Sequence, residues 1–176
     1  MAVANRDAPH GFRYAANLTG GGEYIRTMIH AAADNVAIGR GDFVTPTGAA
    51  NTVEQYDNND PVWGLALNYV ALSVLGDVST IHLNHTSLLS AQEDSTGGSI
   101  AAASEGLNAQ ITVGAANTST GLSIMEIDSS TAATTSTLAL RLYRPAPFVG
   151  NTVAQNNCIW FVTPLELDIA EAKAGV

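Results

Sequence analysis

The sequence predicts a mainly β protein: a single compact β-barrel or β-sandwich of β-tulip-like shape, with one short helix and an extended N-terminal arm. Three observations support this fold class. Short segments rich in β-forming residues recur along the chain, turn residues separate them, and no long helical periodicity occurs. The 176 residues suit one domain that buries about 70% of its unfolded surface without cross-links. We expect an arm over residues 1–16, a β domain over 17–168 and a tail over 169–176.

The N-terminal half contains predicted strands separated by glycine, proline and asparagine. In Glu23–Ala31, side chains alternate so that Met28 and His30 share one face while Ile25 and Ile29 share the other. Further strands are predicted from Phe43 to Pro46 and, as a short strand within an exposed loop, in the polar segment Thr47–Asp60. The apolar run Pro61–Val74 favours a strand that enters the core, with a helix as the alternative. In the arm, His10–Ala16 would place Phe12 and Tyr14 on one face if this segment is extended.

The C-terminal half continues this pattern and adds the predicted helix. Thr80–Ala91 sets Ile81 and Leu83 against His82, which indicates one half-buried strand. Ile100–Leu107 is rich in alanine and has a glycine near its end, so a helix of about two turns is predicted. Shorter strands are predicted at Ile111–Val113, Leu122–Ile127, Leu138–Tyr143 and Cys158–Leu167, with a frayed helical turn at Ile169–Lys173.

Charge is scarce and unevenly distributed. The chain carries 16 acidic and 7 basic residues for a net charge of −9, and no Lys or Arg lies between Gly41 and Leu140. An acidic body repels phosphate backbones, so we expect no nucleic-acid binding. Four arginines fall in the first forty residues. One interpretation is a solubilising acidic surface; the other is an arginine-bearing N-terminal segment that docks on an acidic partner.

No catalytic or metal-binding constellation stands out, so we expect neither an enzyme nor a cofactor. His82 and His85 point to opposite faces of a strand, and Asp57–Asp60 lacks the spacing of a calcium loop. Glu126 and Asp128 do share a strand face, which leaves a glycosidase-like carboxylate pair open, although nothing else in the sequence supports it.

The remaining reactive or recognition-prone side chains lie in apolar runs. Cys158 is expected to be a buried, inert thiol, and Trp63 and Trp160 to be core residues, with an exposed sugar-stacking platform as the alternative. The start MAVANRDAPHGF lacks the pattern of a signal peptide, and no apolar run reaches the ~18 residues of a membrane span. We therefore expect a soluble protein that is made without secretion and binds no membrane.

Several motifs, taken in order, resemble small structural proteins of tailed bacteriophages. They are HGFRYAANLTG, AIGRGDFVTP, SAQEDSTGG, AASEGLNAQITVG, TGLSIMEIDSSTAATTSTLALRL and NNCIWFVTPLEL. The chain resembles the cement, or decoration, proteins that bind the outside of a capsid built from HK97-fold major capsid protein. The resemblance is strongest from Ala101 to Leu142. The chain departs from the family at Gly20–Gly22, which shortens an aromatic segment, and after Leu167, where the tail is extended.

The resemblance implies a non-catalytic virion protein on the outer capsid surface, made in the host cytoplasm, that stabilises the expanded shell. It implies two partners, the major capsid protein and copies of the chain itself, as a homo-trimer or alternatively a dimer. A carbohydrate-binding or adhesion module displayed on a virion is the competing function. Because basic residues concentrate near the N-terminus, capsid contacts are predicted at Arg6, Phe12, Arg13, Tyr14 and Arg26. Small and strand-forming residues predict self-association at Met125, Ile127, Thr134, Thr135 and Thr137, with an ordinary strand and loop inside one subunit as the alternative.

Overall fold

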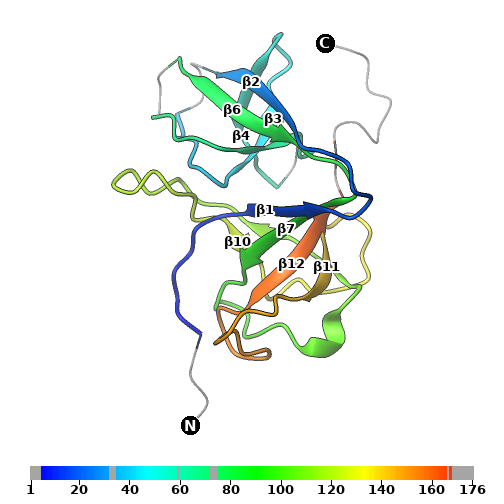
Figure 1. Ribbon diagram of the computed structural model, residues 1–176. Helices are drawn as coiled ribbons and strands as arrows, with labels where there is room; N and C mark the ends of the chain where they lie inside the picture. The colour runs from blue at the N-terminus through cyan, green and yellow to red at the C-terminus, as the bar shows by residue number, and fades with distance from the viewer. Residues whose placement is uncertain (1–4, 32–34, 59, 72–74, 166, 168–176) are drawn as a thin grey trace.

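The computed structural model describes residues 5–31, 35–58, 60–71, 75–165 and 167. The protein is mainly β, as predicted, and stacks a closed five-stranded barrel on a five-stranded sheet (Figure 1). The described residues include no helix with the length and hydrophobicity that a membrane span requires.

The barrel forms the upper part of the molecule in Figure 1 and closes in the strand order β2-β4-β3-β5-β6. Its strands are β2 (Tyr24–His30), β3 (Phe43–Pro46), β4 (Thr52–Gln55), β5 (Gly64–Ala66) and β6 (Asp77–His82). The alternation predicted for β2 is confirmed. Met28 and His30 are buried, and Met28 packs in an apolar cluster with Val44 and Val78, whereas Ile25 and Ile29 are exposed.

The five-stranded sheet has the order β1-β7-β12-β11-β8. Its strands are β1 (Arg13–Asn17), β7 (Ser87–Gln92), β8 (Asn108–Ala109), β11 (Leu140–Pro145) and β12 (Ile159–Pro164). The short pair β9 (Ile111–Thr112) and β10 (Glu126–Ile127) lies beside it. All strands of the barrel lie in sequence between β1 and β7, which pair with each other. The barrel is therefore an insertion held at both ends by one strand pair.

A continuous apolar core joins the barrel to the sheet. Phe12, just before β1, stacks on Phe43 of the barrel with ring centroids 4.3 Å apart, and Phe12 N donates to Gly41 O at 2.9 Å. Leu89 of β7 and Trp160 of β12 belong to the same buried cluster. The two modules consequently share a hydrophobic core, and the barrel contains a second apolar cluster around Val44 and Val78.

Three predicted elements differ from the structure. Thr80–Ala91 is not one strand, because the chain turns after His82 and β7 belongs to the other sheet. The helix expected at Ile100–Leu107 is a single 3₁₀ turn, η1 (Ala102–Ser104). The strand expected at Leu122–Ile127 contains only the two residues of β10.

The N-terminal arm is shorter in the structure than the sequence predicts. β1 begins at Arg13, inside the segment predicted as an arm, so the described arm comprises residues 5–12. The tail predicted over residues 169–176 lies outside the described residues.

Candidate docking face

The outer face of the five-stranded sheet is free of acidic side chains. Its strands β1, β7, β8, β11 and β12 contain no Asp or Glu, although the chain as a whole has 16 acidic residues. Two of these strands carry exposed arginines, Arg13 in β1 and Arg141 and Arg144 in β11. The sheet thus departs from the charge of the rest of the molecule.

Strand register places these arginines on one face. Arg13 is opposite Ser90, Ser90 is opposite Phe161, and Phe161 is opposite Arg144. Directly opposed residues of antiparallel strands point to the same side of the sheet, and neighbouring strands lie about 4.8 Å apart. Arg13 and Arg144 therefore end the same row of side chains across the sheet, about 14 Å apart.

A bulge in β11 adds Arg141 to this face. Residues three apart on a regular strand point to opposite faces, but the register of β11 shifts between Leu142 and Arg144. Arg141 is opposite Thr163 while Arg144 is opposite Phe161, and these two partners are themselves two residues apart. Both guanidinium groups accordingly lie on the outer face.

Aromatic side chains and hydrogen-bond acceptors support these guanidinium groups. The Arg144 Cζ lies 5.7 Å from the centroid of the Phe161 ring, and Phe148 packs edge-on to Phe161 at 6.0 Å. Arg141 Nε donates to Asn108 Oδ1 at 3.4 Å. A cation over an aromatic face keeps its charge while losing part of its freedom, which suits it to meet an anionic partner.

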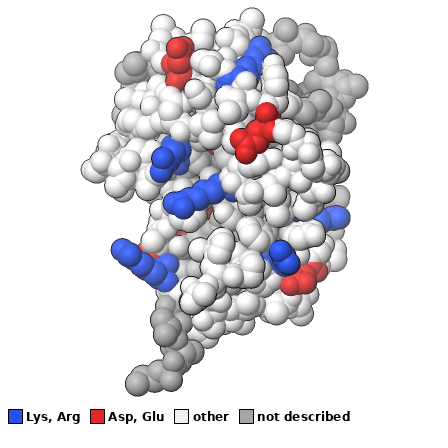
Figure 2. Space-filling model, viewed as in Figure 1, with Lys and Arg blue, Asp and Glu red and all other residues white. Residues whose placement is uncertain are grey.

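The other described arginines are exposed as well. Figure 2 shows basic side chains spread along one side of the molecule, over both the barrel and the sheet, with fewer acidic ones among them. Arg26 lies over the Trp63 ring at 5.9 Å and donates to Asn51 Oδ1 at 3.2 Å. We use the name arginine face for the surface that carries these side chains. Its members are Arg6, Arg13, Arg26, Arg40, Arg141 and Arg144, all exposed.

None of these six arginines forms an ion pair with a carboxylate among the residues that the structure describes. Several acids are instead buried: Asp42, Glu93 and Asp94 lie in the interior. Glu93 Oε2 accepts hydrogen bonds from Ile100 N at 3.0 Å and Trp160 Nε1 at 3.1 Å. These buried acids therefore do not neutralise the exposed arginines.

Burial changes the protonation of these carboxyl groups. Loss of solvent raises the pKa of Glu93 to about 7 and that of Asp42 to about 6. The pKa of Glu126 rises to about 7 through burial and, next, through the neighbouring Asp7 and Asp94 charges. For Asp94, desolvation is the largest single effect and acts to raise the pKa. The hydrogen bonds that Ser129 and Thr112 donate to this carboxylate are stronger in sum, so the pKa of Asp94 is lowered. Near neutral pH the interior carries less negative charge than the sequence implies.

The carboxylates that could form a glycosidase-like pair are engaged separately. Glu126 Oε1 accepts from Gln92 Nε2 at 3.0 Å, whereas Asp128 Oδ1 accepts from Ser130 N and Ser130 Oγ. Asp128 thus forms a local turn, and the two side chains belong to different hydrogen-bond networks. The described residues also contain no group of three or more His, Cys, Asp or Glu arranged to hold a metal ion.

The structure divides the predicted capsid contacts. Arg6, Arg13 and Arg26 are exposed on the arginine face, and Tyr14 is half-buried against the core. Phe12 is 1% exposed and stacks inside the molecule, so its prediction as a surface contact is wrong. For an apolar side chain next to an arginine, the sequence holds no signal that distinguishes a core anchor from a docking residue.

The predicted self-association residues divide in the same way. Met125 and Ile127 are fully buried in the main core and cannot reach another subunit. Thr134, Thr135 and Thr137 are exposed, but they lie in turns after β10 rather than in a strand. This threonine-rich loop covers the outer edge of β8, where Asn108 Nδ2 donates to Thr135 O at 2.9 Å.

The expected core residues are confirmed. Cys158 is a buried free thiol, and burial raises its pKa to about 12. Trp160 is fully buried and Trp63 is nearly so. The sequence pattern does not single out Arg40, Arg141 or Arg144 as site residues, and it contains no counterpart of the bulge that aligns the last two. Comparison of the chain with known proteins finds no matching family model, no matching curated protein and no matching solved structure.

Proposed function

We propose that this protein is a non-catalytic structural component of a phage virion that binds the outside of the capsid and stabilises the expanded shell. The arginine face supports the proposal most directly: in a chain of net charge −9 it carries six exposed cations without carboxylate partners among the described residues, and three of them, Arg13, Arg141 and Arg144, lie on an acid-free sheet. The sequence resemblance to cement proteins points to the same class. The partner on this face is an acidic patch of the major capsid protein.

The charge of the arginine face also indicates that capsid docking and self-association use different surfaces of the protein. A surface on which cations outnumber acids opposes an identical surface, so a symmetric dimer through the arginine face is disfavoured. Copies of the chain, as a trimer or a dimer, would therefore meet through another surface, and the exposed threonine loop remains a candidate. An oligomer presents several arginine faces to the shell, so modest single contacts add up through avidity.

Such a protein acts through a binding equilibrium. A ligand that recognises only the expanded shell stabilises it by about 2.7 kcal/mol per site at a hundredfold excess over Kd. The competing carbohydrate-binding function has less support, because Trp160 is buried and the Trp63 ring is covered by the Arg26 guanidinium. Neither tryptophan offers an open stacking platform.

The test is co-sedimentation with purified expanded shells. We expect a fixed ratio to the major capsid subunit, and an Arg13→Gln/Arg144→Gln variant should bind about tenfold less tightly at 0.1 M salt. The matched control is Asn58→Asp/Asn156→Asp, which changes net charge by the same amount at exposed positions and keeps every arginine of the face. Equal binding by the wild type, the double arginine variant and the control would refute docking through this face. Absence of co-sedimentation by the wild-type protein would refute the proposed function itself.

A further inference from the structure

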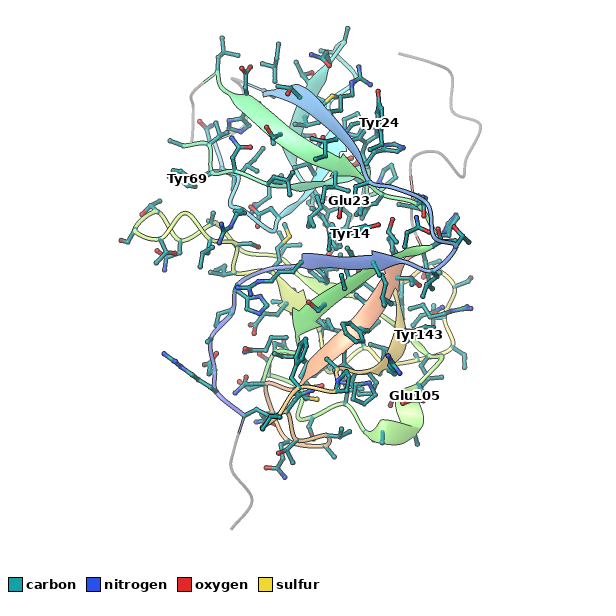
Figure 3. All side chains as sticks on the ribbon, in the orientation of Figure 1. Tyr14, Glu23, Tyr24, Tyr69, Glu105 and Tyr143 are labelled. Atoms are coloured by element: carbon teal, nitrogen blue, oxygen red, sulfur yellow. The ribbon has the colours of Figure 1, made fainter. Side chains whose placement is uncertain are left out.

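A cleft separates β1 from the barrel and opens beside the arginine face. Its volume is about 400 Å³. Leu65 and Ile81 of the barrel line it, together with Tyr14 of β1 and Leu122 of the segment before β10. The charged side chains at the cleft are Arg13, Arg40 and Glu23. Figure 3 shows Tyr14 and Glu23 between β1 and the barrel. An apolar lining with a few polar groups is typical of ligand-binding clefts.

The cleft runs along the free edge of a strand. β1 is the terminal strand of its sheet, with β7 as its only strand partner in the sheet order of the described residues. Phe12, Arg13 and Tyr14 all line the cleft, although consecutive side chains of a strand point to opposite faces. A cleft that touches all three must follow the edge of the strand rather than one face of it.

Backbone groups on this edge point toward the barrel. Phe12 N donates to Gly41 O, away from β7. Hydrogen-bonding directions alternate along an extended chain, so the N–H and C=O of Tyr14 also point away from β7, toward the cleft. A strand edge of this kind is a template for an added strand.

Alternation at the start of β1, over Arg13 and Tyr14 and before the register shift between Tyr14 and Ala16, determines which side chains an added strand would meet. Arg13 is exposed on the outer face, whereas Tyr14 packs against the core that contains Leu65 and Ile81. A neighbouring strand would place one side chain beside Arg13 and the next beside Tyr14. Arg40, across the cleft, adds a second cation with no carboxylate partner among the described residues.

We propose that this cleft binds an extended peptide segment of alternating apolar and acidic residues, which adds to the edge of β1. Its apolar side chains would pack toward Leu65 and Ile81, and its carboxylates would lie near Arg13 and Arg40. The proposal deepens the proposed function, on which it relies for the source of the segment: an exposed acidic stretch of the capsid partner.

Peptide binding to the isolated full-length protein tests this inference. The probe is a fluorescein-labelled, C-terminally amidated Ser-Leu-Glu-Leu-Glu-Leu-Ser peptide, measured by fluorescence anisotropy in 0.05 M salt. The control peptide, Ser-Leu-Leu-Leu-Glu-Glu-Ser, has the same composition without the period of two. We expect the alternating peptide to bind at least ten times more tightly. Equal affinities, or no binding of the alternating peptide at 1 mM, would overturn the proposal.

Two single variants give opposite predicted effects. Arg40→Gln removes a cation from the cleft and should weaken binding of the alternating peptide about threefold to tenfold. Glu23→Gln removes the exposed carboxylate that lines the same cleft and should tighten binding about twofold to fivefold. A general loss of folding cannot produce opposite signs, so equal or like-signed effects would count against the cleft.

Shell binding and peptide binding can fail independently. Loss of peptide binding with retained co-sedimentation would reject the cleft and leave the docking function in place. Peptide binding by a protein that does not co-sediment with shells would support the cleft and reject the capsid as the source of its ligand.

Discussion

At the scale of single residues, Glu93 shows how a charged residue is placed in the core. Its Oε2 accepts from two buried donors, Ile100 N and Trp160 Nε1, while Oε1 has no hydrogen-bond partner among the described residues. Glu93→Leu leaves both donors unpaired and should lower the free energy of unfolding by about 2–4 kcal/mol. Glu93→Gln keeps the acceptor and should cost about 1 kcal/mol or less at pH 5, where the carboxyl is already neutral. Urea denaturation at pH 5 measures both values.

Equal destabilisation by the two Glu93 variants would show that retention of an acceptor oxygen for Ile100 N and Trp160 Nε1 does not preserve stability. This network could not be predicted from the sequence, because Glu93 and Trp160 are 67 positions apart. The adjacent pair Glu93-Asp94 has the composition of an exposed turn, yet both side chains are buried. Tertiary contacts, which local composition does not contain, decide the position of such acids.

At the scale of elements, the start of the N-terminal arm is held by Asn5, which binds the loop between β11 and β12, while Gln92 of β7 binds Asp7 and Ala8. Asn5 Nδ2 donates to Thr152 O at 2.8 Å, and Thr152 N donates to Asn5 Oδ1 at 2.7 Å. Asn5→Ala removes these bonds, and we expect trypsin to cleave after Arg6 about fivefold to tenfold faster. The midpoint of thermal unfolding should change little, because Asn5 is outside the apolar core.

The matched control for the arm is Asn156→Ala. The Asn156 backbone oxygen accepts from Asn5 Nδ2 at 3.1 Å, and this substitution leaves the backbone oxygen in place. Cleavage should therefore remain at the wild-type rate. Limited proteolysis followed by mass spectrometry compares the three proteins, and equal rates for all of them would show that Asn5 does not hold the arm.

The existence of strands is more predictable than their connection. The alternation in β2 and the apolar runs of β5 and β12 identify strands correctly, because burial on one or both faces imposes those patterns. The prediction of one strand over Thr80–Ala91 is wrong because the alternation runs on through Leu83 into a turn. There Asn84 Oδ1 accepts from Thr86 N at 2.9 Å, and the chain leaves the barrel for the sheet. The arginine face is only half predictable for a similar reason: the N-terminal arginines are visible in the sequence, but the β11 bulge is not.

At the scale of the whole molecule, positive and negative side chains differ in their exposure to solvent. The described arginines are exposed and form no ion pairs with described carboxylates, whereas three carboxyl groups are buried. Because these carboxyl groups are buried and the arginines are exposed, the arginine face can be cationic in a protein that is acidic as a whole. The burial of the carboxyl groups also makes folding stability depend on pH in a direction opposite to that of proteins whose carboxylates are paired in the native state.

We expect the protein to be more stable at pH 5 than at pH 8. The folded-state pKa is raised for Asp42 to about 6, and for Glu93 and Glu126 to about 7. The folded protein thus holds protons that the unfolded chain releases, so stability is full below the ordinary carboxyl pKa and is lost as pH rises through 6 to 7. His10 acts in the opposite direction, because burial lowers its pKa. With three groups against one, the midpoint of thermal unfolding should fall by several degrees between pH 5 and pH 8.

Differential scanning calorimetry at several pH values measures this pH dependence of stability. Added salt distinguishes the contribution of surface charge repulsion from that of the buried carboxyl groups. General repulsion at net charge −9 also grows with pH, but 0.5 M NaCl screens it, whereas buried carboxyl groups are screened much less. An Asp42→Asn/Glu93→Gln variant should lose most of the salt-resistant part of the pH dependence. A wild-type midpoint that rises from pH 5 to pH 8 would contradict the assignment of raised pKa values. A decline that 0.5 M NaCl abolishes would attribute the effect to surface charge instead.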